Sequence, residues 1–183
     1  MKAITIAAQS IQTGVNDVVV TGGMESVSNV PYYLYRGDTP FGGITLVDGI
    51  LKDGTTDAFI QMSGVLRTEH LGKTYGLTRE EMDDHAINSY KRSFQSVSSG
   101  LFDKEIVPVK ISGDTDVTVS EDEELKRFDA EKLRSLKPVA ETITAGNTGA
   151  LSDGAAATVL MSSRALKKYN VTPIARIVNV ADM

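Results

Sequence analysis

The sequence of 183 residues contains no cysteine and no tryptophan, and it has only two histidines, His70 and His85. The absence of cysteine excludes disulfides, thiolate metal sites and a cysteine nucleophile within these residues. No apolar run approaches the roughly 20 residues that a membrane-spanning helix needs, so we expect no membrane partner. Residues 1–12 carry a single basic residue, Lys2, which is not typical of a transit peptide or a secretory signal.

The charge balance is acidic, with 19 Lys and Arg against 24 Asp and Glu, a net charge of −5. Such a balance argues against nucleic acid as the main partner. The hydrophobic fraction of 41% is ordinary for a soluble globular protein. A chain of this length can bury roughly 70% of its unfolded surface, which is enough for a real core.

The stretch from Asp17 to Ser26 combines a β-branched apolar run with a glycine pair. Residues 18–20 are all valine, which predicts a parallel strand buried on both faces. Gly22 and Gly23 then predict a sharp turn at the end of that strand. Ligands gather at the carboxyl ends of strands in open α/β sheets, so Glu25 and Ser26 fit a site wall. The alternative is a strand followed by an ordinary tight turn.

The remaining pattern predicts mixed helices and strands on both sides of a long insert. Residues 1–13 fit a helix that ends at Gly14. Thr78 and Glu81 form a capping box that opens a strong helix, which ends at Gly100. The apolar face of this helix is formed by residues at three- and four-residue spacing: Met82, Ala86, Tyr90, Phe94 and Val97.

Further expected elements are strands at 106–111, 117–119, 155–161 and 175–180, a helical turn at 130–136, and a short helix that ends near Asn170. The segment 27–56 is rich in glycine and proline and contains four aromatic residues, Tyr32, Tyr33, Tyr35 and Phe41. It fits either a covering flap at an interface or a packed surface loop.

Several motifs, in order, resemble the thiolase family, above all its acetyl-CoA acetyltransferase branch. They are Val20-Thr-Gly-Gly-Met-Glu-Ser26, Lys52-Asp-Gly54, Ile87-Asn-Ser-Tyr90, Glu105-Ile-Val-Pro-Val109 and Asp153-Gly-Ala-Ala-Ala157. The resemblance covers nearly the whole chain. It implies an α/β fold: an incomplete, layered α/β/α N-terminal domain (1–30 and 151–183) with an inserted α+β CoA-binding loop domain (31–150). It also implies that a missing strand lies between the strands at 17–21 and 155–161.

The resemblance implies an acyl transfer between CoA thioesters, in which acetoacetyl-CoA is formed or cleaved. The family's nucleophile is a cysteine at a helix N-terminus, where the helix dipole favours the thiolate. The helix at Met1 resembles the one that follows this cysteine, and neither histidine has the family's Gly-His-Pro context. We therefore expect no catalytic residue in this chain and no activity of the chain alone. The alternative is a non-catalytic fragment that binds CoA or a thiolase subunit.

What the resemblance carries over is part of a CoA pocket. Arg127, Phe128, Asp129 and Lys132 match the family segment at the adenine and phosphate end of CoA, and Tyr90 matches a tyrosine near CoA. An arginine can pair with phosphate and stack on a purine, and a phenylalanine offers a ring face. The alternatives are basic residues that balance the acidic run 121–124, and a Tyr90 that serves core packing.

In the mitochondrial-type subgroup the matching tyrosine also lies near potassium, which gives Tyr90, Ala145, Gly146 and Thr148 as a candidate potassium site. No prosthetic group is implied, and CoA or acetyl-CoA is the expected substrate. The expected partners are further copies of the chain or a full-length thiolase. The same subgroup favours a mitochondrial location, with the cytoplasm as the alternative.

The chain departs from the family pattern at two CoA contacts. Gln61-Met-Ser-Gly64 stands where the family has a histidine before Met-Gly, and Gly149 stands where the family has a serine. A lost neutral hydrogen bond costs about 0.5–1.5 kcal/mol. We therefore expect CoA binding to be weaker than in the family by roughly an order of magnitude or more.

Overall fold

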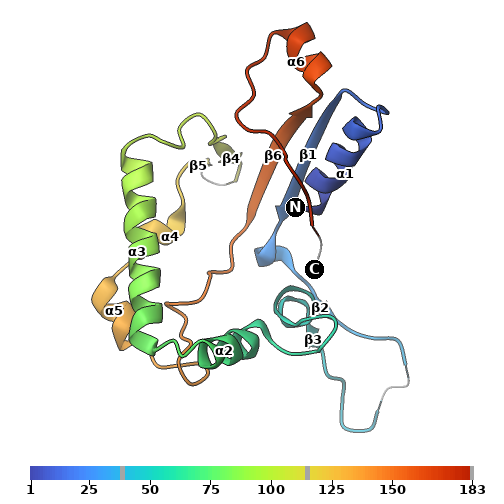
Figure 1. The fold of residues 1–183 in the computed structure, drawn as a ribbon. Coiled ribbons are helices and arrows are strands. Elements are labelled where there is room, and N and C mark those ends of the chain that lie inside the picture. The colour runs from blue at the N-terminus through green and yellow to red at the C-terminus, as the bar shows by residue number, and fades with distance from the viewer. Residues whose placement is uncertain (38–39, 114–115, 182–183) are drawn as a thin grey trace. The chain divides into compact units, whose positions relative to one another are not determined.

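The computed structural model describes residues 1–37, 40–113 and 116–181. The chain forms two compact units, one of Met1–Val30 with Leu151–Met183 and the other of Pro31–Ala150 (Figure 1). The first unit contains helix α1 (Lys2–Gln12), strand β1 (Val18–Glu25), the short 3₁₀ turn η1 (Val27–Asn29), strand β6 (Gly154–Met161) and helix α6 (Ser163–Tyr169). Each unit is a mixture of helices and strands.

Helix α1 packs on the pair of strands β1 and β6 (Figure 1). It buries Thr5, Ala7 and Ala8 and ends before Gly14, whose φ of 75° suits glycine. Ser162 caps the start of helix α6, because its hydroxyl accepts from the Ala165 amide at 3.1 Å. The expected helices in this unit are therefore confirmed.

The expectation of a parallel β1 with a missing strand beside it is wrong. β1 pairs directly and antiparallel with β6, from Val18 opposite Met161 to Glu25 opposite Gly154. The two strands share a complete ladder, which leaves no room for another strand between them. The side-chain hydroxyls of Thr21 and Thr158, which face each other across this ladder, are 2.8 Å apart.

The expectation of a turn at the glycine pair is also wrong, because both glycines lie inside β1. A Cβ on Gly22 would lie 2.8 Å from the Ala156 carbonyl oxygen, so this glycine allows a close approach of two backbones. The valines are not buried on both faces either, since Val20 is 71% exposed. The β-branched run forms a strand because of its local propensity, and its pairing follows from β6.

The expected strand at 175–180 does not form in the described residues. A strand needs a partner for its amides and carbonyls, and within the described part of the chain no strand pairs with this segment. Ile174 and Val178 are largely exposed.

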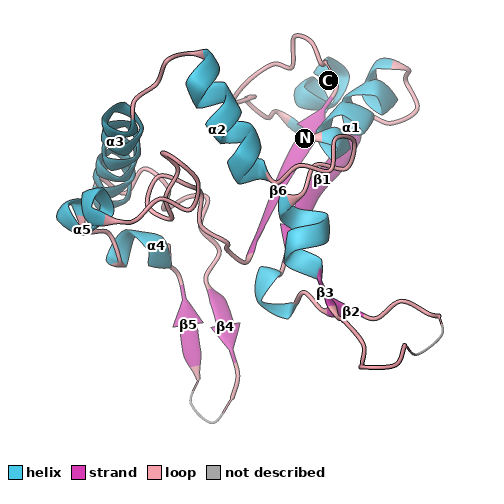
Figure 2. Cartoon of the chain, turned by 90° about the horizontal axis from the view of Figure 1, so that it is seen from below, coloured by secondary structure: helices cyan, strands magenta, loops and turns pink. Residues whose placement is uncertain are grey.

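The second unit begins with the two-residue strands β2 (Tyr32–Tyr33) and β3 (Val47–Asp48), followed by the π-helical turn η2 (Ile50–Thr55). Its helices are α2 (Gly64–Thr74), α3 (Arg79–Ser98), α4 (Glu123–Lys126) and α5 (Ala130–Ser135). Strands β4 (Val109–Ile111) and β5 (Val117–Val119) form an antiparallel pair (Figure 2). The sequence predicted β4 three residues too long at its start.

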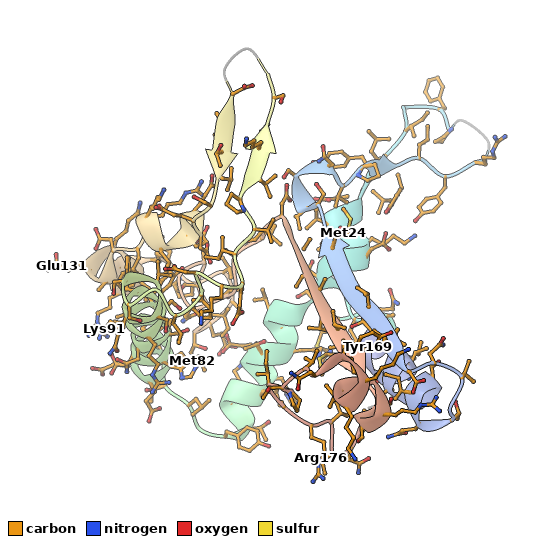
Figure 3. The ribbon with its side chains drawn as sticks, turned by 90° about the horizontal axis from the view of Figure 1, so that it is seen from above. Met24, Met82, Lys91, Glu131, Tyr169 and Arg176 are labelled. Atoms are coloured by element: carbon orange, nitrogen blue, oxygen red, sulfur yellow. The ribbon has the colours of Figure 1, made fainter. Side chains whose placement is uncertain are left out.

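Helix α3 begins with the predicted capping box. The Thr78 amide donates to the Glu81 carboxylate at 2.8 Å, and the Glu81 amide donates back to the Thr78 hydroxyl at 3.2 Å. Met82 (Figure 3) packs toward α2, because a Cβ on Gly72 would lie 2.6 Å from its methyl carbon.

The predicted apolar face of α3 is only partly correct. The positions buried most deeply are Asp83 and Ile87, whereas Phe94 and Val97 are about two-fifths exposed. Helices α4 and α5 both contact α3. Among the described residues, no helix is long and apolar enough to cross a membrane.

Candidate functional site

Three aromatic rings join α3 to the segment between α4 and α5. Phe128 stacks on Tyr90, with ring centroids 4.5 Å apart and planes inclined by 19°. Phe94 meets the same Phe128 ring at 6.0 Å in a tilted arrangement. Tyr90 and Phe128 are both half-buried. Two of the predicted site residues are therefore direct neighbours, and Tyr90 also serves packing, as the alternative stated.

The Tyr90 hydroxyl is directed at the acidic run. It donates to the Glu124 carboxylate at 3.5 Å. Partial burial, and then the negative charge of Glu124, raise the pKa of Tyr90 above its usual value. The phenol therefore stays protonated at neutral pH, so it acts as a neutral hydrogen-bond donor or acceptor.

The basic residues of this segment are paired with the acidic run before them. The Arg127 guanidinium lies 3.4 Å from Glu123 and 3.6 Å from Glu124, and Lys126 pairs with Glu121 at 2.7 Å. The Arg127 and Glu123 side chains are each 69% exposed, so this pair is weak and exchangeable. The charge balance proposed as the alternative is present, and it leaves the guanidinium accessible.

Asp129 caps helix α5. Its Oδ1 accepts from the amides of Glu131 and Lys132, each at 3.0 Å. Lys132 lies exposed in the first turn of that helix. One carboxylate oxygen of Asp129 is thus bound to the helix start, and it fixes the Lys132 backbone there.

Ala145, Gly146 and Thr148 lie on the loop that follows α5. Gly146 packs against α5 so closely that a Cβ there would lie 2.7 Å from the Leu133 Cγ. Among the described residues, Tyr90 forms no hydrogen bond or ring contact with these three. Tyr90 thus comes from α3, and the other three candidate potassium ligands come from the loop.

The sequence reasoning missed the two carboxylates that hold this loop, Glu69 on α2 and Asp83 on α3. Glu69 accepts from the amide and the hydroxyl of Thr142, each at 2.9 Å. Hydrogen bonds from the Thr142 backbone and neighbouring donors lower the pKa of Glu69. Asp83 could have been found, because it lies one turn after Arg79 and one turn before Ile87 on an apolar stripe. No local pattern marks Glu69.

Neither histidine lies in a catalytic arrangement. His70 and His85 are exposed on α2 and α3. His85 lines a shallow polar hollow along α3 that also contains Asn88 and Arg92. Within the described residues, no group of three or more His, Cys, Asp or Glu side chains is arranged to hold a metal ion.

The family and its structures agree with this architecture. Residues 1–164 match the family "Thiolase, N-terminal domain". The whole chain aligns at 50% identity with 44% of the mitochondrial acetyl-CoA acetyltransferase of Macaca fascicularis, and at 49% identity with 44% of its Homo sapiens counterpart. The chain thus spans less than half the length of these relatives.

The same likeness holds in three dimensions. A crystal structure of Acat5 thiolase from Ascaris suum in complex with coenzyme A matches 94% of this chain and 45% of that one, with a TM-score of 0.87 and 42% identity. The Bacillus anthracis acetyl-CoA acetyltransferase matches over the same shares, with a TM-score of 0.87 and 35% identity. The chain belongs to the thiolase family, and its fold is that of the thiolase N-terminal domain.

Proposed function

We propose that residues 1–183 are the CoA-binding portion of a thiolase of the acetyl-CoA acetyltransferase type. The observation that carries this proposal is the identity of about 50% over the whole chain to relatives with that name. In the reaction, an acetyl group forms a carbon–carbon bond with a second acetyl-CoA, and CoA is released. Thiolysis of acetoacetyl-CoA is the reverse.

The two compact units receive different roles in this proposal. Residues 31–150 are the inserted CoA-binding unit, and residues 1–30 with 151–183 are part of the layered α/β/α domain. The second role requires strands that pair with β1 or β6 beyond those in the described residues. Further copies of the chain, or a full-length thiolase, are the proposed partners.

CoA would bind with its phosphate end at Arg127 and Lys132. Both side chains are exposed, and Asp129 fixes Lys132 through the start of α5. Phe128 has one ring face covered by Tyr90, so an adenine can use only the other. Glu123 competes with a phosphate for the Arg127 guanidinium, because both accept from it.

The loop offers potassium neutral oxygen ligands. Among the described residues, no donor bonds to the carbonyl oxygens of Ala145 and Gly146. Carbonyl and hydroxyl oxygens are ligands for hard cations, so these two carbonyls and the Thr148 hydroxyl suit potassium. A bound cation would supply local positive charge. The residues present would hold it, with Tyr90 as the neutral phenol of the set.

The chain contains no cysteine, so these residues do not supply the thiolate that thiolase chemistry requires. We therefore propose that the 183-residue chain alone binds CoA without turnover. A non-catalytic CoA- or subunit-binding role is the second candidate, favoured by an exposed cationic pair beside stacked rings. The mitochondrial relatives favour a mitochondrial location, with the cytoplasm as the alternative.

Calorimetric titration of CoA into the 183-residue chain tests the proposal. We expect saturable binding that weakens by roughly tenfold or more in the double variant Arg127→Ala, Lys132→Ala, since a charge-assisted hydrogen bond contributes about 1.5–3 kcal/mol. Lys104→Ala removes an exposed charge outside the cluster and should bind like the wild type.

The absence of saturable CoA binding would overturn the proposed function. Equal weakening by Lys104→Ala would show a general charge effect and would overturn the site. A thiolysis assay with acetoacetyl-CoA completes the test, because measurable turnover by this chain would contradict the expected lack of activity.

A further inference from the structure

Two buried carboxylates from different helices converge on a single loop, residues 142–148. Glu69 of α2 is 6% exposed and Asp83 of α3 is 3% exposed. Burying an ionised carboxylate is costly unless several donors satisfy it. The hydrogen-bond partners of these two carboxylates therefore indicate their role in the fold.

Both carboxylate oxygens of Glu69 accept hydrogen bonds from the start of the loop. Its Oε2 accepts from the amides of Thr142 and Ile143, at 2.9 and 3.3 Å. Its Oε1 accepts from the Thr142 hydroxyl at 2.9 Å. These bonds fix the direction in which the chain enters the loop after Pro138.

Asp83 holds the far end of the same loop through Asn147. Its Oδ1 accepts from the Asn147 side-chain amide at 2.9 Å, and its Oδ2 accepts from the Arg79 Nε at 2.7 Å. Arg79 donates in turn to the Leu136 carbonyl at 3.0 Å, at the end of α5. Asp83 thus ties the loop to α5 through two neighbours.

Between these anchors the loop turns its amides inward. Thr144 is fully buried, and its hydroxyl accepts from the amides of Gly146 and Asn147 at 3.2 and 3.3 Å. The Thr144 amide donates to the Asn147 side-chain oxygen at 2.8 Å. The carbonyls of Ala145 and Gly146 are left without donors among the described residues, and Ala145 is exposed.

We propose that Glu69 and Asp83 are positioning residues that fix the 142–148 loop in the shape that receives CoA. The part of this proposal that concerns CoA, its ligand half, rests on the proposed function. A loop with inward amides presents carbonyls to its ligand. Glu69 draws in the amides at the start of the loop, and Asp83 holds the Asn147 side chain, because carboxylates can only accept. They act through the loop and touch no ligand themselves.

The test measures amide hydrogen exchange of the ligand-free 183-residue chain by NMR, together with CoA affinity by calorimetry. In Glu69→Ala we expect exchange at Ile143, Thr144 and Asn147 to accelerate by at least tenfold, with exchange in the middle of α3 unchanged. CoA affinity should fall at least fivefold. Glu80→Ala removes an exposed carboxylate at the start of α3 and should match the wild type in both readouts.

Glu69→Gln separates shape from charge, because a glutamine oxygen can still accept both amides while the Thr142 hydroxyl turns to accept from its NH₂ group. We expect this variant to recover most of the loop protection and most of the CoA affinity. If Glu69→Ala does not fold, Glu69→Gln and Thr142→Val provide the same comparison, and Thr142→Val should then show the larger effect.

Unchanged loop exchange in the folded Glu69 or Thr142 variants would overturn the positioning role. Faster loop exchange with unaltered CoA affinity would overturn the link to the ligand. If the wild type itself binds no CoA, the proposed function fails and the ligand half fails with it. The exchange data still decide the role in the loop, because they are collected without ligand.

Discussion

The ring of Phe128 stacks on the ring of Tyr90, with centroids 4.5 Å apart. This contact joins the middle of α3 to the connection between α4 and α5, where the candidate phosphate-binding residues lie. Tyr90 is therefore both a packing residue and a neighbour of the proposed site. The stack places Arg127, next in the chain to Phe128, at the edge of the cluster.

Phe128→Ala should destabilise the second unit and weaken CoA binding together. A stacked pair contributes about 0.5–1.5 kcal/mol beyond its buried area, and half-burial of the ring adds to this, so we expect a loss of about 1–3 kcal/mol. Phe128→Leu keeps apolar contact and should lose about 1 kcal/mol less. Urea unfolding of both variants measures the difference, and wild-type stability in Phe128→Leu would show that the stack itself contributes nothing.

Neighbouring glycines in β1 provide a matched pair. A Cβ at Gly22 would lie 2.8 Å from the Ala156 carbonyl oxygen, whereas a Cβ at Gly23 meets nothing within 4 Å. Because a backbone atom cannot move aside cheaply, Gly22→Ala should cost about 1–3 kcal/mol. Gly23→Ala should change stability by less than about 1 kcal/mol. Thermal unfolding of the two variants checks this, and an equal response would contradict the close pairing of β1 with β6.

Features set by neighbouring residues were predictable from the sequence, and those set by distant pairing were not. The capping box of Thr78 and Glu81 needs only a three-residue spacing, so it was predicted correctly. The antiparallel pairing of β1 with β6 joins residues that are 129 to 143 positions apart, from Glu25 with Gly154 to Val18 with Met161, and neither strand carries a signal for its partner. The glycine pair was mistaken for a turn, because close backbone approach and a turn both select glycine.

The candidate site shows the same division. The stacked Tyr90 and Phe128 and the charges around Arg127 come from residues that the motifs singled out. Glu69 was missed because its burial results from a loop more than 70 residues further along the chain. Glu69 accepts hydrogen bonds from that loop. A charged side chain on a helix normally predicts a solvated face, so tertiary context decided this position.

Asp17 should make the first unit sensitive to acid. Hydrogen bonds from Arg164 and Ser162 lower the pKa of this carboxyl, and the Ser162 hydroxyl lies 2.7 Å from it. A lowered pKa contributes stability above the unfolded value of about 3.9, and this stability is lost as the pH falls through the folded value.

Asp17→Asn removes this titration and keeps an acceptor for Ser162. We expect the wild type to have the higher melting temperature at pH 6, and the difference to shrink as the pH drops below about 4. Other carboxyls, such as Asp153, titrate in both proteins and cancel in the comparison. Melting curves from pH 6 to pH 3 measure this, and a difference independent of pH would rule out the assigned cause.

Glu123 should limit the affinity of the chain for CoA. Its carboxylate lies 3.4 Å from the Arg127 guanidinium, and both side chains are 69% exposed. A phosphate that binds Arg127 competes with Glu123 for the guanidinium and lies close to its negative charge. Glu123→Gln removes the negative charge and weakens the competition for the guanidinium, so we expect CoA to bind roughly two- to fivefold more tightly, the range that one exposed ion pair allows.

The gain in Glu123→Gln should disappear at high ionic strength, because salt screens exposed charges beyond a few ångströms. Glu105→Gln changes the net charge equally at an exposed position outside the cluster, so it isolates the local effect. Calorimetric titration of CoA at 0.05 M and 1 M salt, with both variants, decides between a local effect at Arg127 and a general effect of net charge. An equal gain in Glu105→Gln would attribute the effect to the overall acidity of the chain, and no gain in Glu123→Gln would place the CoA phosphates away from Arg127.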